Sequence, residues 1–257
     1  MKTTKAAALS AVIAIKPAFK PAPAKFEVTC ASCNLRELCL PGGLCLEDLE
    51  RVEHIVYARR RVRRGEALFN AGTEFNALYA IRSGFFKSSV LDGEGREQVT
   101  GFFMAGELIG LDGLGGGSYH ATMVALEDSE VCVLPYALIE KMAQQVPALQ
   151  RHLHTVLARE IVRDHGVMLL LGSMRAEERL ATFLLNLSKR FLRRGYSASD
   201  FHLRMTREEL GSYLGLKLET VSRLFSQFQA ERLIDVQQKH VRILDIAGLE
   251  RLLAAKH

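Results

Sequence analysis

The sequence has no tryptophan, and only 7% of its residues are aromatic. Surfaces that stack successive unpaired bases are built from aromatic side chains, so this scarcity disfavours a single-strand-binding protein. No apolar run reaches the length of about 18 residues that spans a bilayer, so no membrane partner is predicted. The 48% hydrophobic and 25% charged residues also exclude collagen-like and disordered chains. A globular protein with one large core or two modest ones remains.

Net charge is missing from the first two thirds of the chain. Residues 1–171 hold 19 basic and 19 acidic side chains, whereas residues 172–257 hold 15 and 10, so the formal charge of +5 belongs to the C-terminal third. A local basic excess favours a nucleic-acid partner for that third.

The first 25 residues are rich in Ala, Pro and Lys and imitate a secretory signal that ends at Ala22–Ala24. The stretch is weakly hydrophobic and Lys16 interrupts it, so we predict a flexible tail over residues 1–25 instead. A cytoplasmic protein is expected, because a reducing compartment suits the closely spaced cysteines between Cys30 and Cys45.

The pattern after the tail indicates an α+β protein. Apolar spacing predicts a short helix over Leu46–Tyr57, and closely spaced strands separated by glycines predict a β-roll or jelly roll within residues 47–146. The expected strands are Ala67–Phe69, Leu78–Ile81, Phe85–Val90, Val99–Phe103, Ala121–Leu126 and Val131–Leu134.

Two helices are predicted next. Residues 147–172 carry a long apolar stripe, which usually meets another helix of the same chain or of a partner, and Arg175–Arg193 forms a second helix. Asp164 lies on the stripe, and spacing alone does not decide whether it is only a solvated edge residue.

The C-terminal unit, residues 173–257, has the pattern of a winged helix-turn-helix. Thr206-Arg-Glu-Glu209 is a capping box, Gly215 breaks the helix that follows it, and a second helix starts near Leu218. An alternating segment from Ile234 to Ile243 predicts a hairpin or wing, with Lys239 and His240 at its tip able to reach phosphate.

Three side chains project together from the start of the second helix. Glu219, Ser222 and Arg223 have the spacing of one helix face and the hydrogen-bonding groups that suit base edges in the major groove. The alternative is an ordinary ion pair on a solvated helix, but the capping box, the turn and the basic excess favour DNA reading.

Four of the five cysteines crowd into sixteen residues. Cys30, Cys33 and Cys39 follow the pattern C-x2-C-x5-C, Cys45 comes next, and Cys132 lies far away. Four thiolates with this uneven spacing suit an iron–sulfur cluster as well as zinc, and unliganded buried thiols remain a third reading.

These motifs together resemble the oxygen-sensing fumarate and nitrate reduction regulators, the FNR branch of the cyclic-AMP-receptor superfamily. The resemblance runs from about Cys30 to the C-terminus. It rests on the cysteine pattern with Cys132, on Leu214-Gly-Leu-Lys-Leu-Glu-Thr-Val-Ser-Arg223, on Ala176-Glu-Glu-Arg-Leu180 and on Asn186-Leu-Ser188.

The resemblance implies a 4Fe-4S cluster held by Cys30, Cys33, Cys39 and Cys132, intact without oxygen and dismantled by it. Cys45 has no place in that set. The long helix becomes the helix of a homodimer, in which two copies of Asp164 repel each other, and cluster binding offsets that repulsion. The implied dimer residues are Leu157, Ile161, Asp164, Met168 and Leu171.

The resemblance also implies a palindromic DNA site with TTGAT-like halves. Lys217 and Thr220 join Glu219, Ser222 and Arg223 as DNA contacts, although relatives often carry a capping Thr where this chain has Lys217. The loop Leu91–Glu97, with Gly95 and Arg96, resembles a surface that contacts RNA polymerase, but it also suits a plain hairpin turn.

Three other functions are each compatible with part of the sequence. A cyclic-nucleotide sensor needs a cationic residue for the phosphate, and the stretch from Gly106 to Leu126 has no Arg, so no nucleotide effector is expected. A thiol enzyme that uses Cys30 and Cys33 leaves the DNA-reading unit unexplained, and we predict no enzyme. A zinc-structured transcription factor remains the alternative without a sensing role.

Overall fold

The computed structural model describes residues 30–52, 55–56 and 58–254. The predicted tail at residues 1–25 and the start of the cysteine segment at 26–29 therefore lie outside the described residues. Three short elements come first: η1 (Cys30–Ser32), η2 (Arg36–Leu38) and α1 (Leu46–Val52). The helix expected over 46–57 is shorter than predicted, because Ile55 and Val56 already lie outside α-helix.

Eight strands form the N-terminal β-roll, as the fold prediction required. They are β1 (Ala58–Val62), β2 (Ala67–Phe69), β3 (Ala77–Ser83), β4 (Phe85–Leu91), β5 (Glu97–Met104), β6 (Leu108–Ile109), β7 (Thr122–Ala125) and β8 (Ser129–Pro135), with a 3-10 turn η4 (Leu111–Gly113) after β6. Two antiparallel sheets result, with strand orders β1-β8-β3-β6 and β2-β7-β4-β5. Sequence reasoning missed β1 and β6, because β1 is mostly arginine and β6 has only two residues.

Aromatic side chains fill the space between the two sheets. Phe69 stacks on Tyr119 with ring centroids 3.9 Å apart and on Tyr79 at 5.7 Å. The Tyr119 hydroxyl donates to the Ala77 carbonyl oxygen at 2.6 Å, so its polar end is satisfied inside the core.

A glycine makes the tight connection between β3 and β4. Gly84 has φ of +96°, and an added Cβ would lie 1.9 Å from Oγ of Ser129. Both the backbone conformation and the close approach therefore require glycine at this position.

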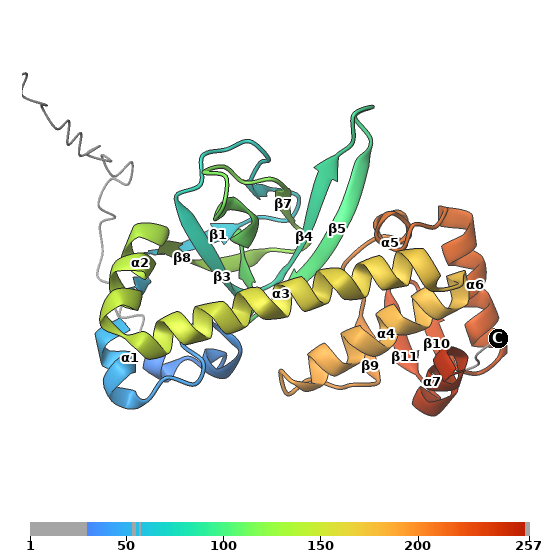
Figure 1. Ribbon diagram of the computed structural model, residues 1–257. Coiled ribbons are helices and arrows are strands. Elements are labelled where there is room, and N and C mark those ends of the chain that lie inside the picture. The colour runs from blue at the N-terminus through green and yellow to red at the C-terminus, as the bar shows by residue number, and fades with distance from the viewer. Residues whose placement is uncertain (1–29, 53–54, 57, 255–257) are drawn as a thin grey trace, which may run out of the picture.

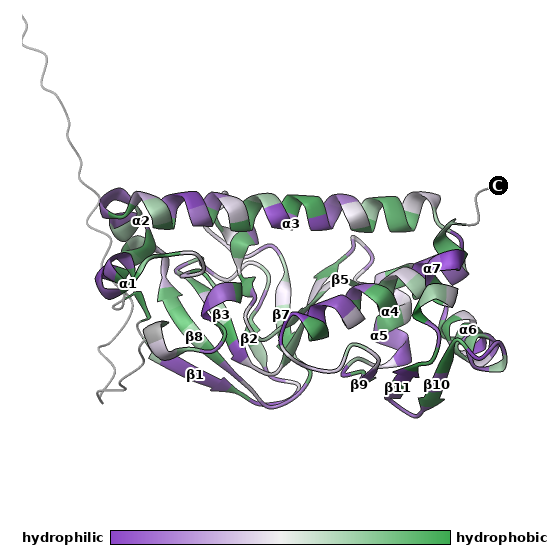
Figure 2. Ribbon diagram, turned by 90° about the horizontal axis from the view of Figure 1, so that it is seen from below, coloured by the Kyte–Doolittle hydropathy of each residue, from purple (hydrophilic) through white to green (hydrophobic). Residues whose placement is uncertain are grey.

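The long helix α3 (Pro147–Ser173) follows α2 (Tyr136–Gln145) and spans the molecule from the cysteine segment to the C-terminal unit (Figure 1). Its two fully buried leucines lie at opposite ends. Leu149 packs in the core with Leu40 and Leu49 of the cysteine segment and α1, whereas Leu170 packs in the core of the C-terminal unit. This one helix therefore connects the cysteine segment with the C-terminal unit, and polar and apolar residues alternate along it (Figure 2).

The C-terminal unit is a winged helix-turn-helix, as predicted. It contains α4 (Ala176–Leu192), β9 (Asp200–His202), α5 (Arg207–Leu214), α6 (Leu218–Ala230), β10 (Ile234–Gln237), β11 (His240–Ile243) and α7 (Ile246–Ala254). Sequence reasoning missed β9 and α7. The three residues of β9 are strand only because they pair with β11, and that pairing is not local in sequence.

The C-terminal unit packs directly against the β-roll of its own chain. Phe102 and Met104 of β5 belong to the same buried core as the helices of the C-terminal unit. Oγ of Ser212 on α5 accepts from the Val99 backbone N–H at 2.9 Å. Arg190 of α4 and Arg194, two residues after the end of that helix, also reach the roll, where both donate to the Glu107 carboxylate.

None of the helices within the described ranges combines the length and the hydrophobicity that crossing a bilayer requires.

Candidate metal centre and nucleic-acid interface

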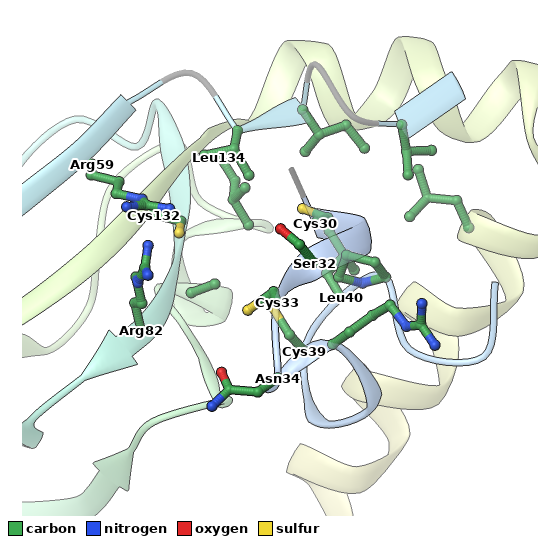
Figure 3. Close-up of a pocket in the computed structure, with 17 residues that line it drawn as sticks. Cys30, Ser32, Cys33, Asn34, Cys39, Leu40, Arg59, Arg82, Cys132 and Leu134 are labelled. Atoms are coloured by element: carbon green, nitrogen blue, oxygen red, sulfur yellow. The ribbon is translucent and has the colours of Figure 1, made fainter. Parts of the chain in front are cut away.

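Four cysteines line one cavity of about 110 Å³ at the end of the β-roll (Figure 3). Cys30, Cys33 and Cys39 come from the N-terminal segment, and Cys132 faces them from strand β8. Chain topology thus brings the distant cysteine to the cluster of three, as the sequence interpretation required. Cys45 is exposed and does not line the cavity.

Local backbone structure holds the three N-terminal cysteines in tight turns. The Cys33 backbone N–H donates to the Cys30 carbonyl at 3.2 Å, and the Cys39 N–H donates to the Leu35 carbonyl at 3.1 Å. Leu40, 2% exposed, then anchors the segment in the core. Cys132 is held differently, because β8 is paired on both sides, with Arg59 of β1 and Ala80 of β3 opposite it.

The cavity disfavours thiolates when no cation is bound. Burial raises the pKa of the Cys39 thiol to about 12, and the nearby thiols of Cys30, Cys33 and Cys132 raise it further. Burial also raises the pKa of Cys132, although Arg59 and Arg82 oppose the shift. Thiols ligate metals as thiolates, so a strongly cationic group is needed to bring four of them together in that form.

The donor set consists of four thiols around one cavity. Within residues 30–52, 55–56 and 58–254, no three Cys, His, Asp or Glu side chains lie close enough together to hold one metal ion. Zinc draws its four ligands to about 2.3 Å from a single point, whereas an iron–sulfur cluster is held by thiolates at its corners. The chemistry of four thiols suits either kind of site.

Local sequence signals set where helices α5 and α6 begin and where α5 ends. Oγ1 of Thr206 accepts from the Glu209 N–H at 3.1 Å, and the Glu209 carboxylate accepts from the Thr206 N–H at 2.7 Å, so the capping box that begins α5 is present. Gly215 ends α5 in the left-handed conformation with φ of +63°. The helix α6 then starts after Lys217, whose side chain makes no cap.

One face of α6 is buried and the opposite face is free. Glu219, Ser222 and Arg223 are exposed on the same side, Lys217 is exposed just before the helix, and Thr220 is half-buried. The inner face packs through Val221, Leu224, Phe225 and Phe228. The five predicted DNA-contact residues thus lie at one helix N-terminus, in the placement that suits major-groove entry.

Sequence reasoning missed Arg207, which holds the two helices together. Its guanidinium lies 3.2 Å from the centroid of the Phe225 ring, and burial lowers its pKa to about 10. A single Arg after the capping Thr carried no signal of this contact, because Phe225 comes 18 residues later.

The wing residues expected to touch phosphate are engaged within the chain. Nζ of Lys239 donates to the Arg204 carbonyl at 3.0 Å, and the His240 ring contacts the Asp200 carboxylate at 2.6 Å. Both side chains are half-buried. Each is therefore partly exposed to solvent while its contact stabilises the wing.

The predicted dimer stripe is divided in the structure. Ile161 and Met168 are 56% and 67% exposed, and Asp164 is exposed, whereas Leu157 and Leu171 are half-buried in their own chain. Val162 and Leu169, which the prediction left out, are 67% and 57% exposed. The free apolar face of α3 is thus rotated slightly from the expected stripe.

The loop between β4 and β5 is an exposed hairpin tip closed by its own side chains. The Asp92 carboxylate accepts from the Arg96 backbone N–H at 2.9 Å and from Nε of Arg96 at 2.8 Å, and these hydrogen bonds lower the pKa of Asp92. Gly95 has φ of +78° and is exposed at the turn. The tip is exposed, which suits both a polymerase contact and a plain hairpin turn.

Two family models match the chain. Residues 59–146 match a model described as a cyclic nucleotide-binding domain, and residues 178–252 match one described as a Crp-like helix-turn-helix domain.

Known transcription regulators match over most of the chain. The transcriptional activator protein Anr of Pseudomonas protegens is 47% identical over 219 residues, which cover 85% of this chain and 90% of that protein. The fumarate and nitrate reduction regulatory protein of Escherichia coli K12 is 39% identical over 225 residues, covering 88% and 90%. Among solved structures, FixK2 from Bradyrhizobium japonicum has a TM-score of 0.72 at 30% identity, covering 78% of this chain and 98% of that one.

Proposed function

Since the chain belongs to the CRP/FNR family of DNA-binding transcriptional regulators, we propose that it senses oxygen through a 4Fe-4S cluster bound by Cys30, Cys33, Cys39 and Cys132. The observation that carries this proposal is the convergence of those four thiols on one cavity. When bound, such a cluster supplies iron and sulfide that oxygen can oxidise. The proposed working parts are the cysteine segment 26–46, the β-roll 47–146, the dimer helix 147–172 and the winged helix-turn-helix 173–257.

The cysteine segment is placed to act on the dimer helix. Leu149, in the first turn of α3, lines the same cavity as the four cysteines and is fully buried. Cys30, Cys39 and Cys132 pack against the core that also contains Leu149 and Leu153. Thiolate ligation at the cavity therefore stabilises the position of the N-terminal end of α3.

The dimer is the proposed output of this coupling. A ligand moves a two-state equilibrium only by its differential affinity, and a change from mostly off to mostly on takes about 5.5 kcal/mol. Metal–thiolate bonding is strong enough to supply that difference. Two paired chains read both halves of a palindrome, whereas one chain reads a single half and loses affinity and register. Contact between the Gly95–Arg96 tip and RNA polymerase belongs to the same proposal.

Cyclic nucleotide is not the proposed effector, although the β-roll matches the cyclic nucleotide-binding domain family. The interior of the roll is filled by Phe69, Tyr79 and Tyr119. Arg163, which faces the roll from α3, pairs with Glu160 and stacks on Phe103 at 4.2 Å. A phosphate would have to displace these contacts without gaining a free cationic partner.

The test compares Cys132→Ser with Cys45→Ser. Both proteins are purified without air, and their iron, acid-labile sulfide and visible absorbance are measured before and after exposure to air. We expect the parent and Cys45→Ser to carry an oxygen-labile chromophore and Cys132→Ser to lack it, because Cys132 lines the cavity and Cys45 does not. A colourless parent that contains zinc would instead establish the zinc-structured alternative, and a Cys132→Ser protein with full cluster would remove that residue from the site.

A further inference from the structure

Two guanidinium groups face the cysteine cavity beside Cys132. Arg59 lies directly opposite Cys132 in the register of β1 and β8, and Arg82 follows from β3, the neighbouring strand on the other side (Figure 3). Both line the cavity together with the four cysteines. The sheet therefore places positive charge at the sulfur that is most rigidly held.

The two arginines differ in their ion-pair and hydrogen-bond partners. Nε of Arg82 pairs with the Glu130 carboxylate at 3.3 Å, so a neighbour already balances its charge. Nε of Arg59 is buried and has no hydrogen-bond partner among the described residues. A buried N–H without a partner costs free energy, so its retention here suggests that an acceptor is bound in the cavity.

The expected occupant supplies that acceptor. The negative charge of four thiolates exceeds the positive charge of the iron–sulfide core that they ligate. The ligated group as a whole is therefore an anion. Sulfur atoms at its surface accept hydrogen bonds, and such bonds tune iron–sulfur sites.

We propose that Arg59 is the positioning residue of this site, which neutralises the sulfur-ligated group and donates its Nε–H to sulfur at the Cys132 corner. The inference rests on the proposed function, because it requires the cluster to be bound. Arg59 itself ligates nothing. It stabilises the bound state through charge and hydrogen bonding, and loss of the residue weakens the site without removing a ligand.

The test uses the full chain with Arg59→Met, which keeps the length of the side chain and removes its charge. Arg61→Met is the matched control, because Arg61 lies two residues further along β1, is exposed and does not line the cavity. The proteins are loaded anaerobically with iron and sulfide, and the loss of visible absorbance to an iron chelator is followed without air. Circular dichroism of the metal-free proteins checks that all of them fold.

We expect Arg59→Met to lose its cluster about 10–100 times faster than the parent, the range typical of lost outer-shell partners. Arg61→Met should match the parent, and Arg59→Lys should recover part of the stability, because it restores the charge without the planar guanidinium.

Equal rates for Arg59→Met, Arg61→Met and parent would overturn the inference and leave the proposed function intact. A parent that takes up no iron and sulfide would overturn both. If Arg59→Met does not fold, Arg59→Lys decides, since a rate equal to that of the parent would show that the guanidinium donates nothing that a plain charge does not.

Discussion

Arg223 is the side chain on which we expect base discrimination to depend most. It is exposed at the N-terminal part of α6 beside Ser222 and Glu219. A guanidinium can donate two hydrogen bonds to O6 and N7 of a guanine, which no other base accepts in the same geometry. We predict that Arg223→Ala loses about 1–3 kcal/mol at one guanine position of the half-site. Binding titrations with single-base variants of the palindrome measure this, and equal weakening on every sequence would reassign Arg223 to phosphate contact.

Residues with local partners could be predicted from the sequence, and residues with distant partners could not. The capping box of Thr206 and Glu209 was evident because both residues belong to one turn of chain. Thiol chemistry already counted Cys132 as a fourth donor, but the choice of the four ligands, which leaves out Cys45, came only from the family resemblance. The guanidinium of Arg59 was missed because its place at the cavity depends on the register of β1 against β8.

Among the secondary-structure elements, α4 is joined to the β-roll by a charged contact. The Glu107 carboxylate accepts from Arg190 and from Arg194, each at 2.6 Å, and the arginines also donate to the carbonyls of Phe102 and Ala105. Burial opposes ionisation of Glu107, but attraction by the two arginines outweighs it and lowers the pKa of this carboxyl group. The Gly106-Glu107 segment thus contacts the C-terminal unit.

We predict that Glu107→Gln lowers the free energy of unfolding by about 3 kcal/mol, because two arginines then lose a partly buried partner. Chemical denaturation at neutral pH measures the loss, with Glu66→Gln as the control for an exposed ion pair, whose loss should change stability little. The Glu107 contribution should be complete above the ordinary carboxyl pKa of 4.5 and should vanish as the pH falls through the lower pKa of the folded state. Equal losses in both variants at every pH would contradict this account.

Strands and helices followed the sequence pattern where the pattern was long. The α3 prediction at 147–172 agrees closely with the observed Pro147–Ser173, because an apolar spacing sustained over seven turns is unambiguous. The arginine-rich β1 was missed, since three of its five residues are Arg and only Val62 is buried, so the strand shows no hydrophobic period.

For the whole molecule, we expect assembly to depend on the exposed face of α3. Ala158, Ile161, His165, Met168 and Gly172 recur at alternating intervals of four and three residues, which is the spacing of a coiled-coil seam, and all are exposed. Asp164 lies beside this seam. Two copies related by a two-fold axis bring two such carboxylates near each other, and their repulsion opposes pairing.

We predict that Asp164→Ala strengthens dimerisation in air about tenfold, or ~1.4 kcal/mol. Sedimentation equilibrium measures the dissociation constant, and Glu140→Ala, which removes an exposed acid from α2, is the control. A variant that remains as monomeric as the Glu140→Ala protein would show that carboxylate repulsion does not limit assembly.

The backbone holds the four cysteines in two different ways. Cys132 belongs to a strand bonded on both flanks, whereas its three companions lie on short turns at the edge of the molecule. If the proposed cluster occupies this cavity, its loss would release the turns but leave the strand in register. We therefore expect β8 to be the fixed support on which the three turns close again when a cluster is rebuilt.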